Sequence, residues 1–503
     1  MQPEKTKTRL EELGEHGWFW FVFFALTIFV YFFGLTIPLV GPDEPRYAQV
    51  AREMFERGDW VTPTLGGFNW FEKPALLYWL EIVSYHILGV NEFAARFGPA
   101  LFGLGTVLSM WMIGRYASGS RRIANWLAML TASTLGIIVF SRGASFDIIV
   151  TFPITASLAG FIIYELNENN PRIALATFYF FIGVALLAKG LIGLVFPFAI
   201  VGLFYLFVRR WPRRDLIYSL VWGVPLFLAV AATWYLPMYL RHGYTFIDEF
   251  IIQQHFQRFT SNKYQHPQPF IFFFWVLPLM TLPWMPLFLL AIWQKIKHLF
   301  RRTRGQIETI NAGPIRADLE VFAWAWLIVP LAFFSFSGSK LPGYILPAVP
   351  PALMLSCYQI LRIIQKRPVV ANWVKGLAVS TFVVIAAVII FIVPRFANAE
   401  TDKKLFETAN AKGLSQLKVT GLFIVSHNAE FYAPGRLIRD ADGKQHKFYS
   451  VHEIRDYIES NGREPLLVLL PHDYVRQLTA NDIVKSKVLE ENGELAIAVV
   501  ELK

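Results

Sequence analysis

Long apolar runs, separated by short polar stretches, occupy the chain up to about residue 394. A helix of roughly 20 apolar residues spans a hydrocarbon core about 30 Å thick. By that length we predict about eleven membrane-spanning helices. They fall near residues 18–38, 96–114, 124–141, 147–164, 173–188, 190–208, 215–236, 270–293, 319–336, 341–362 and 372–394. The pattern therefore predicts an α-helical polytopic membrane protein.

The pattern changes after residue 394. The runs GLFIVS and PLLVLLP predict short buried strands, and VHEIRDYIES has the spacing of an amphipathic helix. The run VLEENGELAIAVV predicts a hairpin that turns at Asn492 and Gly493. We therefore expect a transmembrane domain over residues 1–394 and a small soluble α/β domain over residues 395–503.

Composition supports the membrane assignment. Of the 503 residues, 55% are hydrophobic and only 17% are charged, which is more apolar surface than one soluble core needs. The net charge of +10 is spread over short clusters between the apolar runs. A nucleic-acid-binding protein would gather its basic residues on one soluble face. The expected partner is therefore the lipid bilayer, and no nucleic acid is expected.

Five basic clusters fall on the same side of the membrane in this span count. They are Lys5/Lys7/Arg9, Arg115/Arg121/Arg122, Arg209/Arg210/Arg213/Arg214, Lys295/Lys297/Arg301/Arg302/Arg304 and Lys366/Arg367. Cytoplasmic loops carry an excess of Lys and Arg, so we assign this side to the cytoplasm. The opposite side then receives residues 39–95, residues 237–269 and everything after about residue 395.

The first external segment opens with GPDEPRYAQVAREMFERGDW. Apolar residues from Tyr47 to Phe55 follow helical spacing, which predicts an amphipathic helix at the membrane interface. Asp43 stands at the expected N-cap position and Pro45 in the first turn, so helix capping is one interpretation of Asp43. The other is a general base or sugar-binding carboxylate near the bilayer, because two adjacent acids precede Arg46. The spacing leaves both open.

The same segment continues with FEKPALLYWL, which predicts a second interfacial helix. Lys73 precedes Pro74 and is expected to be extended, with its ammonium near the head-group layer. It would serve there either as a membrane anchor or as a phosphate ligand. Its neighbour Glu72 would be either a metal ligand or the partner of Lys73.

Further ionisable residues stand at span ends, where they are costly unless they face water, a partner or a substrate. They are Arg142, Asp147, Lys189 and Lys340. A lone lysine at an external span end is usually an anchor, but several that converge with Arg258 would form a phosphate site. His255 stands three residues before Arg258. Zinc normally needs three or four protein ligands, and only Glu72 suggests itself as a second.

These motifs together resemble a known family. They are PDEPRYAQVAREMFERGDWVTPTLGGFNWFEKPALLYWL from residue 42, SFD at 145–147, LLAKG around Lys189, HFQRF at 255–259 and SKLPGYILPAVPP at 339–351. The chain is similar to the bacterial aminoarabinose transferases of lipid A, which belong to the GT-C superfamily with the protein O-mannosyltransferases. The resemblance covers the membrane part to about residue 394 and implies a GT-C fold with interfacial helices in the first external loop.

The resemblance implies roles for the charged residues. Asp43 and Asp147 match functional acidic residues in the first and the next external loop, and are the implied catalytic pair. Lys73, Lys189 and Arg258 match basic residues around the carrier phosphate.

It also implies roles for residues near them. Arg46 would lie close to the phosphate-binding cations, and Tyr344 matches a tyrosine near the cavity. Lys340, at another external span end, is included among the candidate substrate-binding residues. Glu72 and His255 match a pair that holds a metal, implied to be zinc.

The function implied is transfer of aminoarabinose from undecaprenyl phosphate to lipid A or a related periplasmic acceptor, without a nucleotide cofactor. The site would face the periplasm from the bacterial inner membrane. One alternative is a GT-C transferase with another polyprenyl-phosphate sugar and a glycan or protein hydroxyl as acceptor. A lipid or sugar transporter is a further alternative, but it would carry charges on broken helices at mid-membrane, whereas here they gather at one outer rim.

Overall fold

The computed structural model describes residues 17–167, 169–257, 268–303 and 317–503. The chain forms two compact units. The first comprises residues 1–33, 72–77 and 98–386, and the second comprises residues 34–71, 78–97 and 387–503. Most of the first external segment therefore shares a compact unit with the C-terminal part of the chain. The boundary between residues 394 and 395 stays a prediction.

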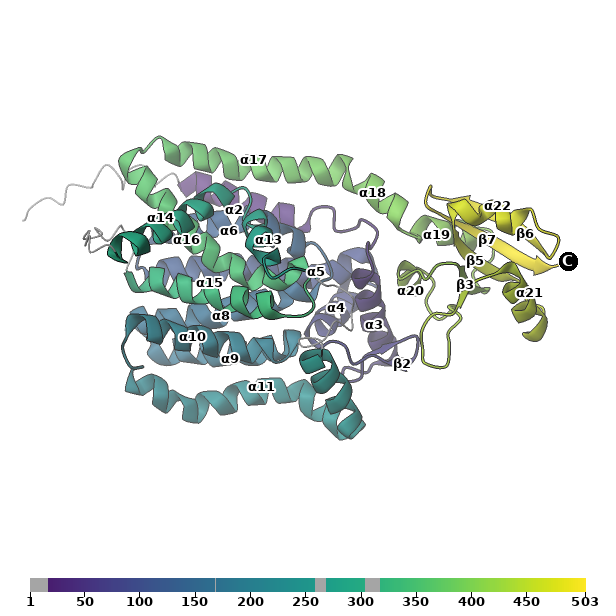
Figure 1. Ribbon diagram of the computed structural model, residues 1–503, viewed down its shortest axis with the longest axis horizontal. Helices are drawn as coiled ribbons and strands as arrows, with labels where there is room; N and C mark the ends of the chain where they lie inside the picture. Colours follow the sequence, from purple (N-terminus) through teal and green to yellow (C-terminus); the bar gives the residue numbers. More distant parts are fainter. Residues whose placement is uncertain (1–16, 168, 258–267, 304–316) are drawn as a thin grey trace, which may run out of the picture. The chain divides into compact units, whose positions relative to one another are not determined.

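The first unit is built from long helices that lie side by side (Figure 1). They are α2 (Gly17–Phe32), α6 (Arg121–Ala132), α7 (Leu135–Ser141), α8 (Phe146–Leu166), α9 (Pro171–Lys189), α10 (Ile192–Val208), α11 (Arg214–Phe246), α13 (Phe272–Met280), α14 (Met285–Thr303), α15 (Ala317–Phe336), α16 (Val349–Lys366) and α17 (Val370–Phe391). Two π-helical segments, η1 (Ile113–Ala117) and η2 (Ile247–Gln257), and a 3-10 helix, η3 (Pro342–Ala348), join them. Helix α5 (Glu92–Met112) belongs to this unit from Gly98 onward.

Seven helical stretches of the described chain are long and apolar enough to cross a membrane. They are Glu92–Ala117, Phe146–Leu166, Pro171–Lys189, Arg214–Gln254, Ala317–Phe336, Pro342–Lys366 and Val370–Phe391. The pair α6 and α7, bent by 61°, would make an eighth. The expected count of about eleven is not confirmed, because α2 and α10 are shorter, with 16 and 17 residues. The expected span 270–293 is divided between α13 and α14.

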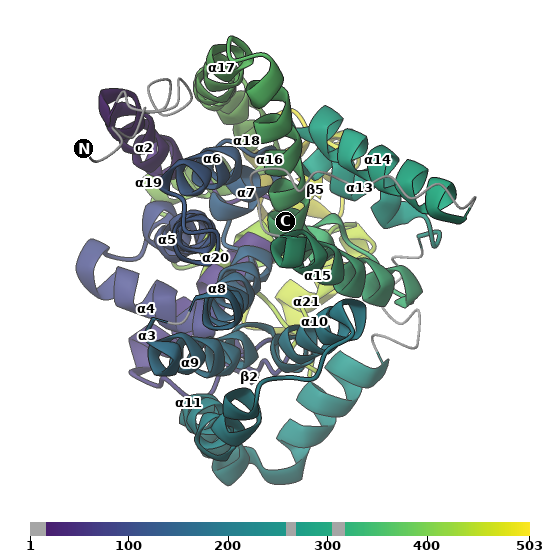
Figure 2. The ribbon, with the colours of Figure 1, turned by 90° about the vertical axis from the view of Figure 1, so that its left-hand side faces the viewer.

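Burial in this unit separates central from peripheral helices. Helices α8 and α16 are almost wholly buried, whereas α11 and α17 are mostly exposed. Figure 2 shows α8 among its neighbours and α11 and α17 at the periphery. Exposed aliphatic side chains on α17 include Val383, Val384 and Ile390. Such a surface is unfavourable in water but suits lipid, which agrees with a multi-pass membrane protein.

The second unit contains a five-stranded sheet in the order β4-β3-β5-β7-β6. Its strands are β3 (Lys418–Leu422), β4 (Lys447–Phe448), β5 (Leu466–Pro471), β6 (Val484–Glu491) and β7 (Leu495–Leu502). Strand β3 is parallel to β4 and β5, and β7 is antiparallel to β5 and β6. Its helices are α18 (Val393–Glu400), α19 (Lys403–Ala411), α20 (Asn428–Tyr432), α21 (Val451–Ser460) and α22 (Val475–Thr479), with the 3-10 turn η4 (His472–Tyr474). This is the expected α/β arrangement.

Three of the four local predictions in this part are confirmed, namely β5, α21 and the β6–β7 hairpin. The prediction for GLFIVS is wrong in its extent, because β3 ends at Leu422. Phe423 has a φ of 63°, a left-handed conformation that breaks the strand. A Cβ on Gly421 would lie 1.9 Å from the Ile424 carbonyl oxygen, so the chain folds back over β3 at this point.

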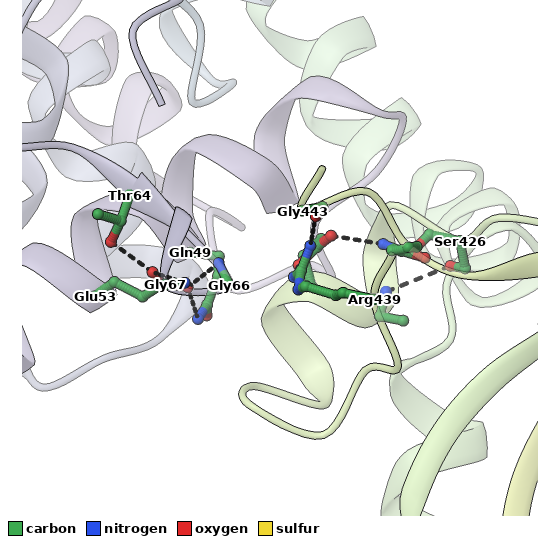
Figure 3. Close-up of polar contacts among 11 residues, drawn as sticks. Gln49, Glu53, Thr64, Gly66, Gly67, Ser426, Arg439 and Gly443 are labelled. Carbon is green, nitrogen blue, oxygen red and sulfur yellow. Dashed lines mark hydrogen bonds and ion pairs between the residues drawn. The ribbon is translucent and has the colours of Figure 1, made fainter. Parts of the chain in front are cut away.

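The second unit also holds the first-loop elements, which are α3 (Asp43–Arg57), β1 (Thr64–Leu65), β2 (Phe68–Asn69) and most of α4 (Leu76–Leu88). The β1–β2 hairpin is fastened to α3 by Glu53 (Figure 3). The Glu53 carboxylate accepts hydrogen bonds from Thr64 Oγ1 at 2.7 Å, Gly66 N at 2.6 Å and Gly67 N at 3.1 Å. Both glycines have positive φ, which the tight turn requires.

The loop that carries Arg439 contacts this hairpin. Arg439 Nη1 donates to the Gly443 carbonyl oxygen at 2.9 Å, and its guanidinium pairs with Glu430 (Figure 3). A Cβ on Gly66 would lie 2.0 Å from Arg439 Nε, whereas a Cβ on Gly67 would meet nothing within 4 Å. Gly66 is therefore needed for two reasons: its left-handed backbone conformation, and the close approach of the Arg439 side chain.

This difference between two adjacent glycines gives a test. We expect Gly66→Ala and Gly67→Ala each to cost about 1–2 kcal/mol for the left-handed backbone. Only Gly66→Ala should add a steric cost, because it displaces Arg439. Gly66→Ala should therefore show the lower melting temperature and faster proteolysis at residues 435–446. Equal melting temperatures and equal proteolysis in the two variants would contradict the Gly66–Arg439 contact.

A buried acid in the same unit gives a pH-dependent test. Burial raises the pKa of Asp402 to about 6, although a hydrogen bond donated by Ser426 acts in the opposite direction. The folded state holds this proton more tightly than the unfolded chain does. The contribution of Asp402 to stability is therefore complete below pH 3.8 and is lost as the pH rises through about 6.

Asp402→Asn cannot ionise, so its stability should vary less between pH 5 and pH 8. At pH 8 the variant should be more stable than the wild type by roughly 3 kcal/mol. Melting temperatures across this pH range measure the effect, with the exposed Asp473→Asn as control. Parallel pH profiles for wild type and Asp402→Asn would rule the effect out.

Candidate active site

In the first unit, Asp147 and Lys189 meet at one end of two adjacent helices. Asp147 lies in the first turn of α8, where Ser145 caps the helix by accepting a hydrogen bond from Asp147 N at 3.2 Å. Lys189 is the last residue of α9. Because α8 and α9 are consecutive and packed together, the start of one lies beside the end of the other. The Lys189 ammonium forms an ion pair with Asp147 Oδ1.

Tyr344 completes this group, which we call the Asp147 cluster (Asp147, Lys189 and Tyr344). The Tyr344 ring centroid lies 4.7 Å from Lys189 Nζ, within range of a cation–π contact. A Cβ on the preceding residue, Gly343, would lie 1.9 Å from Asp147 Oδ2. Gly343 therefore lets the η3 backbone approach the carboxylate, which places Tyr344 over the ammonium.

The Asp147 cluster is partly accessible. The side chains of Lys189 and Asp147 are 15% and 17% exposed. An ammonium has three hydrogen-bond donors, and its ion pair with Asp147 uses one of them. The cluster can therefore accept an anionic ligand on Lys189 while Asp147 still compensates part of the charge.

Lys340 is placed differently, and its ammonium binds backbone carbonyls. Lys340 Nζ donates to the Ser337 carbonyl oxygen at 2.6 Å and to that of Gln268 at 3.1 Å. Burial lowers the pKa of Lys340. These contacts join the segment before α13 to the end of α15, so a substrate-binding role for Lys340 stays a prediction.

In the second unit, Asp43 begins α3 and pairs with Arg46, with 2.6 Å between Oδ1 and Nη2. Arg46 also donates from Nε to the Pro42 carbonyl oxygen at 2.7 Å, and its guanidinium lies 5.6 Å from the Trp70 ring centroid. The expectation that Asp43 is the N-cap is wrong. Pro42 holds that position and has no side-chain acceptor to cap the helix, while the Asp43 carboxylate pairs with Arg46. Half of the Asp43 side chain, 51%, remains exposed.

The adjacent Glu44 has a separate, structural role. Its carboxylate pairs with the guanidinium of Arg96, at 2.7 and 3.1 Å, and accepts from Val40 N at 3.1 Å. Arg96 also donates to the carbonyl oxygens of Leu35 and Pro38, each at 3.0 Å, and to that of Ile37. The pair thus fixes the segment that leads into α3, and Asp43 with it.

Sequence reasoning missed one residue of α20 and one just before it; α20 packs against α3. Tyr432 OH accepts from Leu39 N at 2.8 Å and donates to Glu92 at 3.2 Å. His427, immediately before α20, lies within the electrostatic reach of the Asp43–Arg46 pair. Burial lowers the pKa of His427, Arg46 lowers it further, and Asp43 acts in the opposite direction. An isolated histidine in a distant soluble segment carries no signal that would have linked it to Asp43.

The remaining predicted residues are not brought together by any described contact. Arg258 and the side chain of His255 lie outside the described residues. Glu72 and Lys73 lie just before α4, in the first unit. Among the described residues, no three His, Cys, Asp or Glu side chains could hold a metal ion together. The described residues therefore do not make a zinc site, and the pair Glu72 and His255 stays a prediction.

Each unit thus presents an acid beside a cation. The cation can bind a phosphate, and the acid can orient or deprotonate an acceptor.

The model of the family described as dolichyl-phosphate-mannose-protein mannosyltransferase matches residues 18–247. The chain is 32% identical over 396 residues to the undecaprenyl phosphate-alpha-4-amino-4-deoxy-L-arabinose arabinosyl transferase of Aeromonas hydrophila, covering 75% of this chain and 68% of that one. It is 32% identical over 361 residues to the protein of that name from Serratia proteamaculans, covering 67% and 58%.

Solved structures share the fold. ArnT from Cupriavidus metallidurans, bound to undecaprenyl phosphate, matches with a TM-score of 0.79 and 22% identity, covering 95% of this chain and 97% of that one. The archaeal oligosaccharyltransferase AglB from Archaeoglobus fulgidus matches with a TM-score of 0.54 and 12% identity, covering 91% and 69%. Because the chain is 32% identical to the Aeromonas relative and covers 68% of it, the chain belongs to the undecaprenyl phosphate-alpha-4-amino-4-deoxy-L-arabinose arabinosyl transferase family.

Proposed function

We propose that this chain transfers 4-amino-4-deoxy-L-arabinose from undecaprenyl phosphate to lipid A or a related acceptor. The observation that carries the proposal is the Asp147 cluster, with its mostly buried lysine at one end of an apolar helical bundle. A polyprenyl phosphate places its phosphate where the hydrocarbon core ends, and a paired cation at that depth can bind it. The names of the relatives supply the sugar and the carrier.

In the proposed reaction, an acceptor oxygen forms a bond to the anomeric carbon of the sugar. The bond from that carbon to the phosphate oxygen breaks, and undecaprenyl phosphate leaves with the electron pair. The leaving group is already an ionised phosphate, so catalysis consists mainly of holding it and aligning the acceptor. Lys189 would bind the phosphate, and Asp147 would hold the Lys189 ammonium in place.

Asp43 would act on the acceptor side. A phosphate oxygen of lipid A is already ionised and needs little deprotonation, whereas a hydroxyl needs a base. The half-exposed Asp43 carboxylate is suited to that role or to orienting the amino group of the sugar. The finer assignment to the periplasmic face of the inner membrane rests on the basic clusters, which mark the other face as cytoplasmic.

The first test concerns Asp43. Because Asp43 does not cap α3, Asp43→Asn should fold normally but lose about a hundredfold or more of its transfer rate, since an amide can neither take up the acceptor's proton nor pair with the amino group of the sugar. The assay is transfer from purified undecaprenyl phosphate-aminoarabinose to lipid A, with melting temperature measured in parallel.

Glu56→Gln is the matched control. Glu56 lies on the same helix, is 52% exposed and pairs with Arg52 at 2.7 Å. It should keep full activity. Wild-type activity in Asp43→Asn would end the catalytic role of Asp43.

The second test concerns Lys189. Losing a charge-assisted hydrogen bond to the carrier phosphate costs about 1.5–3 kcal/mol, so Lys189→Met should raise the KM for the donor by roughly 10- to 150-fold. Lys189→Arg keeps the charge and should be affected less.

The double variant Asp147→Asn/Lys189→Met separates binding from charge balance. If Lys189 only neutralises Asp147, removing both charges should restore the donor KM. If Lys189 binds phosphate, the KM should stay high, and its return to the wild-type value would disprove the binding role.

A further inference from the structure

A polar cavity lies between α14, α15 and α16 of the first unit. Its volume is about 260 Å³. The lining includes Lys295 and Lys297 from α14, Trp324 from α15, and Tyr358 and Arg362 from α16. None of these residues belongs to the Asp147 cluster or to the Asp43–Arg46 pair.

Two hydrogen-bond donors that line this cavity have no partner within the described part of the chain. The hydroxyl of Tyr358 and the indole N–H of Trp324 are buried, and neither bonds to any described residue. The Tyr358 side chain as a whole is only 4% exposed. Leaving a buried polar group unsatisfied costs about 1–3 kcal/mol. A ligand with hydrogen-bond acceptors in this cavity would satisfy both groups.

The charges around the cavity favour an anion. Lys295, Lys297 and Arg362 contribute three cations, and Glu320 is the one carboxylate among the described lining residues. Arg362 Nη2 lies 3.5 Å from Glu320 Oε2, so these two charges balance, and Lys295 and Lys297 leave the lining positive. A cluster of cations with hydroxyl and indole donors suits a phosphate, which has only acceptors to offer.

The cavity lies at the opposite end of the bundle from the Asp147 cluster. Helix α16 begins five residues after Tyr344 and reaches Tyr358 about two and a half turns later. This end carries the basic clusters at Lys295–Arg302 and Lys366–Arg367, which the proposed topology places at the cytoplasmic surface. Basic cavities between transmembrane helices at that surface bind anionic lipid head groups.

The membrane setting of the cavity favours a lipid as the source of the phosphate. On α14, Trp293 is 64% exposed, Ile296 is 42% exposed and Phe300 is 68% exposed. By helical spacing these side chains lie on the face of α14 turned away from the cavity lining, and this face would contact acyl chains. The helix that supplies two cations to the cavity therefore also borders lipid, which free phosphate would not exploit. We propose that this cavity binds the phosphate head group of an anionic membrane phospholipid, separately from the sugar donor.

The test uses the full chain, purified in a neutral detergent. Dioctanoyl phosphatidylglycerol, dioctanoyl phosphatidylcholine and inorganic phosphate are added in turn, and the melting temperature is measured. A ligand that binds only the folded state raises the melting temperature. Phosphatidylglycerol alone should do so. An equal rise with phosphatidylcholine would overturn the anionic assignment, and an equal rise with inorganic phosphate would overturn the lipid assignment.

Two variants locate the binding. Tyr358→Phe removes only the unpartnered hydroxyl, so without lipid its melting temperature should equal or exceed that of the wild type. With phosphatidylglycerol, the rise should shrink by at least half in Tyr358→Phe and in Arg362→Gln. Arg172→Gln, which changes an exposed residue at the start of α9, should leave it intact. An undiminished rise in both cavity variants would place the lipid elsewhere and refute the proposal.

Discussion

A charged side chain that leaves water needs an opposite charge or hydrogen bonds, and both units are organised around this requirement. Arg96 shows it most fully. Its guanidinium is only 5% exposed and is met by Glu44 and by three backbone carbonyls at residues 35–38. Those carbonyls belong to the segment that enters α3. The need to satisfy one buried cation therefore fixes the path of the chain up to Asp43.

The same requirement bears on the protonation of a nearby buried acid, Glu81. Glu81 of α4 is completely buried, and neither of its carboxylate oxygens has a hydrogen-bond partner among the described residues. Burial raises its pKa well above the usual range, and the charge of Glu44 raises it further. Burial and the charge of Glu44 therefore both favour the neutral form of Glu81.

Glycine makes the close approaches that these networks need. At Gly343 the backbone comes so near Asp147 that any side chain would collide with the carboxylate, and at Gly66 it does the same against Arg439. Both places bring a loop onto a charged side chain. The reactive groups are held by such contacts and also remain accessible, as the half-exposed Asp43 carboxylate illustrates. In an accessible ion pair such as Asp43–Arg46, either side chain can give up part of its contact with the other and bind substrate instead.

The sequence by itself determined the elements whose signals are local. Apolar runs located the spanning helices, although helices near the limiting length, such as α2 and α10, left their number open. Period-two and helical spacing located β5, α21 and the final hairpin. Motif residues singled out Asp43, Asp147 and Lys189 as candidates, since ionisable groups beside the bilayer are costly without a partner or a substrate.

The tertiary structure alone decided which of these residues meet. It paired Lys189 with Asp147 and placed the ring of Tyr344 against the Lys189 ammonium, although the three residues come from separate segments. It also gave the adjacent acids different partners: Asp43 forms an exposed ion pair with Arg46, and Glu44 forms a buried one with Arg96. It also brought His427 and Tyr432, from a segment almost 400 residues away, against α3. The period of a helix or strand fixes which face a side chain occupies. Which residue a side chain contacts depends on how segments distant in the sequence pack together, and a local sequence pattern carries no information about that packing.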